Sequence, residues 1–170
     1  MTLLAVQDLQ VTFGAAPPIR AIDGLSFDLG WGEALGIIGE TGAGKTTVAR
    51  ALLGLHPPEC VRGSIRLDGR ELLMLSEEEW RTIRWRRIAL VVQSVGTALD
   101  PVYRVGDQIA EPMRYHLDLS PADIEDRIES LARHVGLGPR HLRAYPHQLS
   151  GGEKQRVLLA MALSCDPDVL

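Results

Sequence analysis

The sequence predicts an α/β domain, and three observations carry this prediction. Two short apolar runs, at residues 34–38 and 88–92, have the length and composition of strands buried on both faces. A glycine-rich turn follows the first run and leads into a helix. Farther along, residues 124–135 place apolar side chains at helical spacing, which predicts a helix with one buried face. Strands alternating with helices are typical of an α/β fold.

Composition limits the classes of protein that fit. A chain of 170 residues with 45% apolar and 24% charged residues is expected to form one ordinary soluble domain. The net charge of -4 argues against a direct nucleic-acid partner. Cys60 and Cys165 have neither metal-ligand nor disulfide-framework spacing, which favours a reducing cytosol. The longest apolar run, residues 157–163, is too short to predict a membrane span, and the first ten residues do not resemble a signal peptide.

The first third of the chain predicts antiparallel strands ahead of the glycine-rich turn. Residues 3–13 suggest an edge strand, and residues 25–29 alternate apolar and polar side chains as a half-buried strand does. The turn at Asp68-Gly69 predicts a further strand pair. The helix after the glycine-rich turn is expected from Lys45 to about Gly54.

Helix-capping signals locate the remaining elements. Ser76 and Glu79 have the spacing of a capping box and predict a short helix. Residues 104–145 are predicted to be helical, with one helix starting at Ser120-Pro121 and ending at Gly136. Residues 157–163 are apolar almost all round, so their helix is expected to be buried.

The motif GETGAGKT matches G-x-x-x-x-G-K-[ST] and stands between a predicted buried strand and a helix, as a phosphate-binding loop (P-loop) requires. Glycines let phosphate oxygens approach backbone N–H groups, and the helix directs its positive end at the anion. We expect ATP to be held here, with Lys45 on the β and γ phosphates, Thr46 on Mg2+ and Thr47 on the α phosphate. The nucleotide-binding residues predicted from this motif are Gly39, Glu40, Thr41, Gly42, Ala43, Gly44, Lys45, Thr46 and Thr47.

A second motif, LSGGE at residues 149–153, follows downstream. Ser150 and Glu153 form another capping box, which alone predicts only a well-capped helix. Together with the P-loop, the motif resembles the signature sequence of the ABC ATPase family. In that family two nucleotide-binding domains pair head to tail, and the signature of one closes over the γ phosphate bound by the other. The resemblance gives this role to Ser150, Gly151, Gly152 and Glu153, with Glu153 where Gln is commoner.

The resemblance extends to other positions. Gln93, after the second apolar run, matches the family's glutamine that contacts Mg2+ and the attacking water, and so joins Lys45 as an expected catalytic residue. Phe13 matches the aromatic residue that stacks on adenine, where Tyr is usual; a plain core side chain is the alternative. Residues 93–101 and 105–116 resemble ATP-binding subunits of peptide and nickel importers, although Val95 stands where those subunits have Pro.

The implied fold is a P-loop NTPase of ABC type with N-terminal antiparallel strands and a helical subdomain. We expect an ATP-binding core at about residues 1–92, the glutamine loop and helical subdomain at about 93–148, and the signature with its helix at 149–170. Family members continue with a strand bearing a metal-binding Asp and a general-base Glu, and with a switch His; none is in this sequence, and Asp166 and Asp168 precede that strand. The expectation is a partial domain that binds ATP, hydrolyses it poorly, and depends on further chain or a partner to complete its sheet.

The resemblance implies the ATP-binding subunit of an importer of peptides or related solutes. Its implied partners are a second nucleotide-binding domain, identical or not, and membrane permease subunits contacted between Gln93 and Pro112. The implied location is cytoplasmic, peripheral on the inner face of the membrane. One alternative is a non-transport ABC protein that uses ATP as a clamp on nucleic acid or ribosomes, although no long coiled coil separates the two motifs. Another is a hydrolytically silent nucleotide binder.

Overall fold

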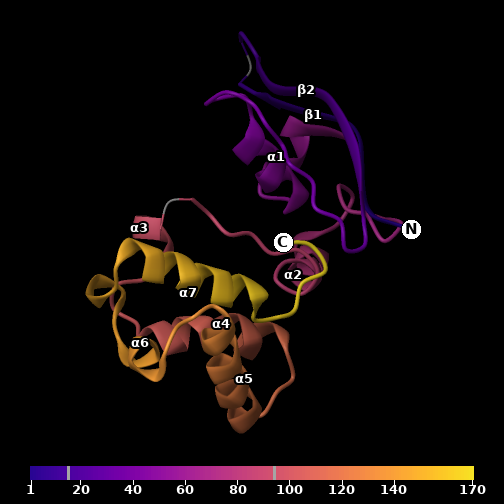
Figure 1. Cartoon of the computed structure of the whole chain (residues 1–170). Coiled ribbons are helices and arrows are strands. Elements are labelled where there is room, and N and C mark those ends of the chain that lie inside the picture. The colour runs from indigo at the N-terminus through magenta and orange to yellow at the C-terminus, as the bar shows by residue number, and fades with distance from the viewer. Residues whose placement is uncertain (15, 94) are drawn as a thin grey trace. The chain divides into compact units, whose positions relative to one another are not determined.

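The computed structural model describes residues 1–14, 16–93 and 95–170 (Figure 1). The chain divides into two compact units, Met1–Arg81 and Thr82–Leu170. Each unit has its own packing, and the two are described separately below.

The first unit is built on a four-stranded antiparallel sheet. Its strands are β1 (Thr2–Phe13), β2 (Ile19–Gly30), β3 (Val61–Leu67) and β4 (Arg70–Glu71), in the order β2-β1-β3-β4. β1 therefore lies inside the sheet, and its prediction as an edge strand is wrong. The inner position explains why Leu4, Val6, Leu9 and Val11 are almost completely buried. The predicted turn at Asp68-Gly69 is confirmed, with both residues at positive φ between β3 and β4.

An irregularity in β1 keeps its buried side chains on one face. From Leu4 onward, the buried positions change from even to odd between Val6 and Leu9, which an unbroken two-residue alternation would not allow. The register shifts there, and Asp8 adopts φ 46°. Opposite it, Gly63 has φ 106°, and a Cβ at that position would lie 2.4 Å from the Asp8 carbonyl oxygen. The bulge and the facing glycine thus occur as a pair.

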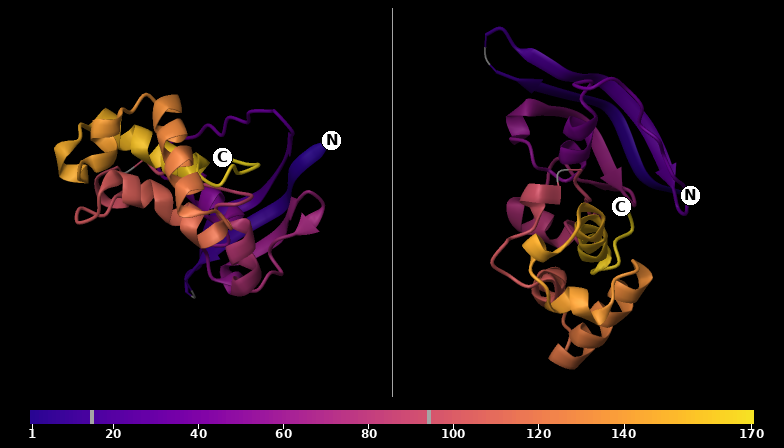
Figure 2. Two further views of the ribbon diagram at one scale, coloured as in Figure 1. Left: turned by 90° about the horizontal axis from the view of Figure 1, so that it is seen from below. Right: turned by 60° about the vertical axis from the view of Figure 1, so that its left-hand side comes forward.

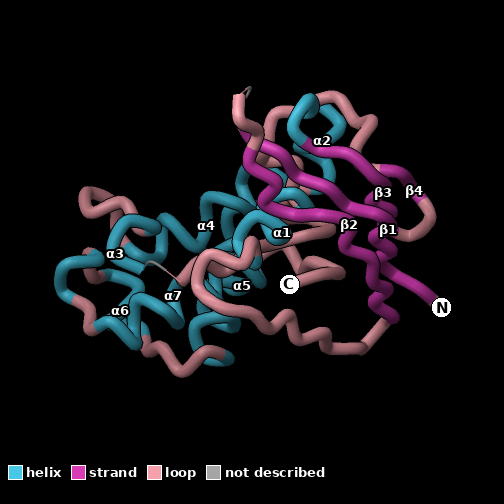
Figure 3. Tube along the Cα trace, turned by 90° about the horizontal axis from the view of Figure 1, so that it is seen from above, coloured by secondary structure: helices cyan, strands magenta, loops and turns pink. Residues whose placement is uncertain are grey.

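Helix α1 (Lys45–Leu52) packs against β2, and the short η1 (Pro58–Cys60) precedes β3. The helix starts where the sequence predicts. The strand predicted at residues 34–38 is wrong: this segment is drawn as loop in Figure 3, and no strand ladder includes it. Leu35, Ile37 and Ile38 are 47%, 43% and 98% exposed. A strand needs a hydrogen-bonded neighbour, and the described residues provide none here.

The second unit is helical. It contains α3 (Val95–Ala98), α4 (Val105–His116), α5 (Pro121–His134), α6 (Pro139–Arg143), η2 (Pro146–Gln148) and α7 (Gly151–Leu163), while α2 (Glu77–Ile83) spans the division between the units. Both views in Figure 2 show α4, α5 and α7 packed together, in agreement with their contacts. The predicted starts at Ser76 and Ser120 are confirmed by capping hydrogen bonds, and Gly136 has φ 74° just beyond α5.

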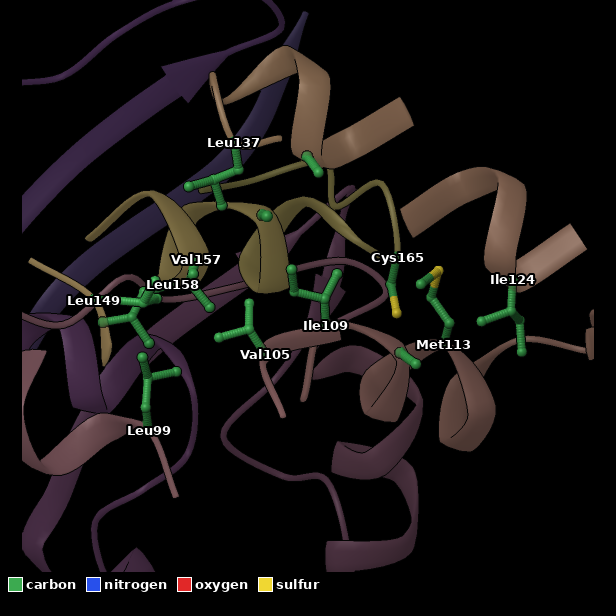
Figure 4. Close-up of a cluster of buried hydrophobic side chains, with 13 residues drawn as sticks. Leu99, Val105, Ile109, Met113, Ile124, Leu137, Leu149, Val157, Leu158 and Cys165 are labelled. Atoms are coloured by element: carbon green, nitrogen blue, oxygen red, sulfur yellow. The ribbon is translucent and has the colours of Figure 1, made fainter. Parts of the chain in front are cut away.

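A single apolar cluster holds these helices together (Figure 4). Every residue from 157 to 163 is buried or half-buried, which confirms the prediction for this part of α7. Two arginines satisfy backbone carbonyls at helix ends: Arg156 donates to Val135 and Gly136, and Arg127 donates to Ser164 at 2.8 Å. The cluster members are Leu99, Val105, Ile109, Ala110, Met113, Ile124, Ala132, Leu137, Leu149, Val157, Leu158, Ala160 and Cys165.

The strand predicted at residues 88–92 is reduced to a single position. Ile88 forms isolated parallel bridges with Arg84 and Val169. The Ala89 N–H donates to the Val169 carbonyl, and the Val169 N–H donates to the Arg87 carbonyl, both at 2.9 Å. The remaining residues of this run form no ladder among the described residues, so the predicted strand is wrong beyond Ile88.

Candidate functional site

The P-loop, residues 39–46, wraps around the side chain of its own lysine. Lys45 Nζ donates to the carbonyl oxygens of Gly39 and Glu40, each at 2.7 Å. A turn closes between them, because the Ala43 N–H donates to the Glu40 carbonyl at 3.1 Å. The ammonium group is thus held over the loop, at the start of α1.

Two glycines give the loop its path. Gly42 and Gly44 both have φ 88°, a left-handed conformation that favours glycine. Gly44 is also crowded, since a Cβ there would lie 2.6 Å from the carbonyl oxygen of Ala21, whereas one at Gly42 would meet nothing within 4 Å. The chain then turns into α1, whose first bond runs from the Val48 N–H to the Gly44 carbonyl at 2.9 Å.

This arrangement suits an anion and a cation together. The N–H groups of the first helical turn have no partners inside the helix, and they carry the positive end of the helix dipole. Thr46 lies in that turn with an exposed side chain. Its hydroxyl would be a ligand for Mg2+, which prefers oxygen and in nucleotide sites is bound by protein oxygens together with substrate phosphates and water. A cavity of about 340 Å³ lies beside the loop, lined in part by Ala43, Lys45 and Val48.

Phe13, the expected adenine-stacking residue, ends β1 and is half-buried. Its ring packs edge-to-face against His56, with centroids 5.3 Å apart and planes at 68°. His56 Nε2 also lies 3.1 Å from the carbonyl oxygen of Thr47, in the first turn of α1. The structure therefore joins Phe13 to the P-loop helix through a histidine that sequence reasoning did not select, because no local motif marks it.

The signature, residues 149–153, lies in the second unit and caps α7 as predicted. The Glu153 N–H donates to Ser150 Oγ at 3.3 Å, and Glu153 Oε2 accepts from the Ser150 N–H and hydroxyl, each at 2.8 Å. Ser150, Gly151 and Gly152 are exposed. The turn therefore presents its glycines to solvent at the positive end of a 13-residue helix.

Glu153 makes a second connection through its other oxygen. Oε1 lies 3.1 Å from Nε2 of His141 in α6, while Nδ1 of the same ring accepts from the Gly138 N–H at 2.8 Å. The pKa of the Glu153 carboxyl is lowered, first by the Ser150 backbone N–H, then by the Ser150 hydroxyl, with His141 adding to the effect. His141 was also not predicted from the sequence, because it lies 12 residues before Glu153 and in a different helix.

Gln93 is exposed and directly follows the apolar run at residues 88–92. Ser94, which follows it in the stretch similar to importer subunits, lies outside the described residues, and so do the side chains of Val95 and Thr97. Among the described residues, no cluster of three or more His, Cys, Asp or Glu is arranged to hold a metal ion. None of the described helices has the length and apolar composition of a membrane span.

Comparison with known proteins identifies the family. The sequence pattern of the family described as "ABC transporter" matches residues 22–170. The chain is 41% identical to the dipeptide transport ATP-binding protein DppD of Lactococcus lactis over 99% of its own length and 50% of that protein. It is 42% identical to the oligopeptide transport ATP-binding protein OppD of Salmonella typhimurium, over 99% of its own length and 51% of the relative. The chain thus spans about half the length of these curated relatives.

Solved structures agree with the sequence relatives. The dimeric ATP-binding cassette MJ0796, bound to ADP and Pi, superposes with a TM-score of 0.86 at 25% identity, covering 96% of this chain and 70% of that one. The predicted fold class, a P-loop NTPase of ABC type, is therefore confirmed. From its sequence pattern, its relatives and its fold, this chain belongs to the ABC transporter family.

Proposed function

We propose that the chain is the nucleotide-binding part of an ATP-binding subunit that powers the import of peptides. The observation that carries this proposal is the P-loop itself, where Lys45 is held by two loop carbonyls at the start of α1. The peptide substrate is supported by the names of the relatives, which are dipeptide and oligopeptide transport proteins.

In the proposed mechanism, Lys45 leaves the carbonyls of Gly39 and Glu40 and donates to the β and γ phosphates of ATP. The amides of the α1 first turn bind the phosphate oxygens, Thr47 binds the α phosphate, and Phe13 stacks on adenine. Mg2+, held by Thr46 and the phosphates, would supply charge neutralisation.

The signature is proposed to act on a second nucleotide-binding domain, where Ser150 and the glycines would contact the γ phosphate of the partner's ATP. The dimeric state named for MJ0796 supports this arrangement. Permease subunits would bind at residues 93–112 and hold the protein at the inner face of the membrane. Hydrolysis would then need a general base supplied from outside residues 1–170.

The test is a calorimetric titration of the chain with ATP in the presence of Mg2+. Lys45→Ala should weaken ATP binding by about 10-fold or more, since a hydrogen bond to a charged group contributes about 1.5–3 kcal/mol. Arg50→Ala is the matched control, because Arg50 is an exposed base in the last turn of the same helix. Equal affinity in Lys45→Ala and the unsubstituted chain would refute the proposal for the P-loop.

A turnover assay tests the proposed dependence on an outside base. The chain should release phosphate from ATP no faster than Lys45→Ala does. Phosphate release well above that control would mean that residues 1–170 already contain a working general base.

A further inference from the structure

His56 contacts two parts of the proposed nucleotide site but has no role in the proposed function. It lies in the loop between α1 and η1, is half-buried, and packs edge-to-face against Phe13 at 5.3 Å between ring centroids. Its Nε2 lies 3.1 Å from the Thr47 carbonyl oxygen. One side chain thus joins the end of β1 to the first turn of the P-loop helix.

The contact with the Thr47 carbonyl oxygen determines which nitrogen of the His56 ring carries a hydrogen. A carbonyl oxygen can only accept, so Nε2 must carry the hydrogen and donate it to Thr47. That bond holds the imidazole against α1. The edge-to-face contact with the imidazole then restricts the orientation of the Phe13 ring, since aromatic rings favour this geometry. The orientation of Phe13 is therefore tied to α1 as well as to its own strand.

This tie bears on Phe13 because its side chain has no polar group. A tyrosine can anchor its ring by a hydrogen bond from its hydroxyl, whereas phenylalanine is held only by packing. In a nucleotide, the distance between base and triphosphate is limited by the sugar. A ring that stacks on the base must therefore keep its position relative to the amides that bind the phosphates.

We infer that His56 is a positioning residue that holds the Phe13 ring against the P-loop helix, in the orientation that stacks on the base of ATP. The inference rests on the proposed function, because it assigns adenine to Phe13 and the phosphates to α1. It adds a residue of the loop after α1 to the site.

The experiment compares dissociation constants for ATP and for inorganic tripolyphosphate, both with Mg2+. His56→Ala should weaken ATP binding by about 3- to 10-fold, the range for losing one aromatic pair, and leave tripolyphosphate binding unchanged. Leu55→Ala is the matched control, since Leu55 is the preceding residue and is 51% exposed. It should change neither constant.

A double substitution separates positioning from an independent contact. Phe13→Ala should weaken ATP binding by about 5-fold or more, because stacking on a base contributes about 1–3 kcal/mol. Adding His56→Ala to Phe13→Ala should then have little further effect, since the ring that His56 positions is gone. Fully additive losses would overturn the inference.

The other outcomes distinguish this inference from the proposed function. If the unsubstituted chain binds neither ATP nor tripolyphosphate, the proposed function fails, and the inference fails with it. If the chain binds both and His56→Ala binds ATP as tightly, only the inference fails. Should His56→Ala not fold, NMR of the unsubstituted chain decides: proton contacts between the two rings and a slowly exchanging Nε2–H are expected, and their absence overturns the inference.

Discussion

The two left-handed glycines of the P-loop form a natural pair for testing the packing of the first unit. Gly42 and Gly44 share φ 88°, but only Gly44 faces a neighbour, since a Cβ there would lie 2.6 Å from the Ala21 carbonyl oxygen. Ala21 belongs to β2, so the oxygen is fixed by the sheet and cannot easily move away. Substituting each glycine with alanine therefore applies the same backbone strain with and without a steric clash.

The expected magnitudes follow from these two effects. Left-handed backbone costs about 1–2 kcal/mol for a residue with a Cβ, so Gly42→Ala should lower the free energy of unfolding by about that amount. Gly44→Ala adds an overpacking cost of about 1–3 kcal/mol, for a total of about 2–5 kcal/mol. Urea unfolding of both variants and the unsubstituted chain measures the difference. Equal losses in the two variants would refute the assignment of the close contact to Gly44.

Two further predictions concern the second unit. Ile109→Ala removes a fully buried side chain from the helical core and should lower the free energy of unfolding by about 2–5 kcal/mol, while Val102→Ala, at a site 71% exposed, should stay within about 0.5 kcal/mol; similar urea midpoints for both would contradict this core. Ser150→Ala should raise the pKa of Glu153 toward its ordinary 4.5, as followed by NMR titration of the carboxyl. Because the folded-state pKa is lowered, the capping contribution is complete at neutral pH and is lost as the pH falls through that pKa. The variant keeps the bond from the backbone N–H but lacks the hydroxyl, so this acid-dependent loss should be smaller. An unchanged Glu153 pKa in Ser150→Ala would show that the Ser150 hydroxyl does not contribute to the shift.

Local features of the fold were predictable from the sequence. The capping boxes at Ser76, Ser120 and Ser150 depend on residues three positions apart, so their spacing is visible in the sequence. The same holds for the start of α1 and for the turn at Asp68-Gly69. Interactions within one turn need no knowledge of the rest of the chain.

Features that depend on distant neighbours were not predictable. The run at residues 34–38 has the composition of a buried strand, but strand formation also requires a paired neighbour, which the described structure does not give it. β1 was predicted as an edge strand, because the sequence does not show that β3 pairs with its second side and puts it inside the sheet. The ring contact of His56 with Phe13 joins residues more than forty positions apart, and no periodicity reports such a contact.

The two oxygens of Glu153 also restrict which residues can replace each other in evolution or in design. A glutamine at this position has a single oxygen, which could serve Ser150, and its amide group would then face His141 as a donor. When Nδ1 accepts from the Gly138 N–H, Nε2 of the neutral imidazole is a donor, and the amide of a glutamine would then face a second donor. The residue types at positions 141 and 153 are therefore expected to vary together among relatives, with the histidine retained where the acid is retained.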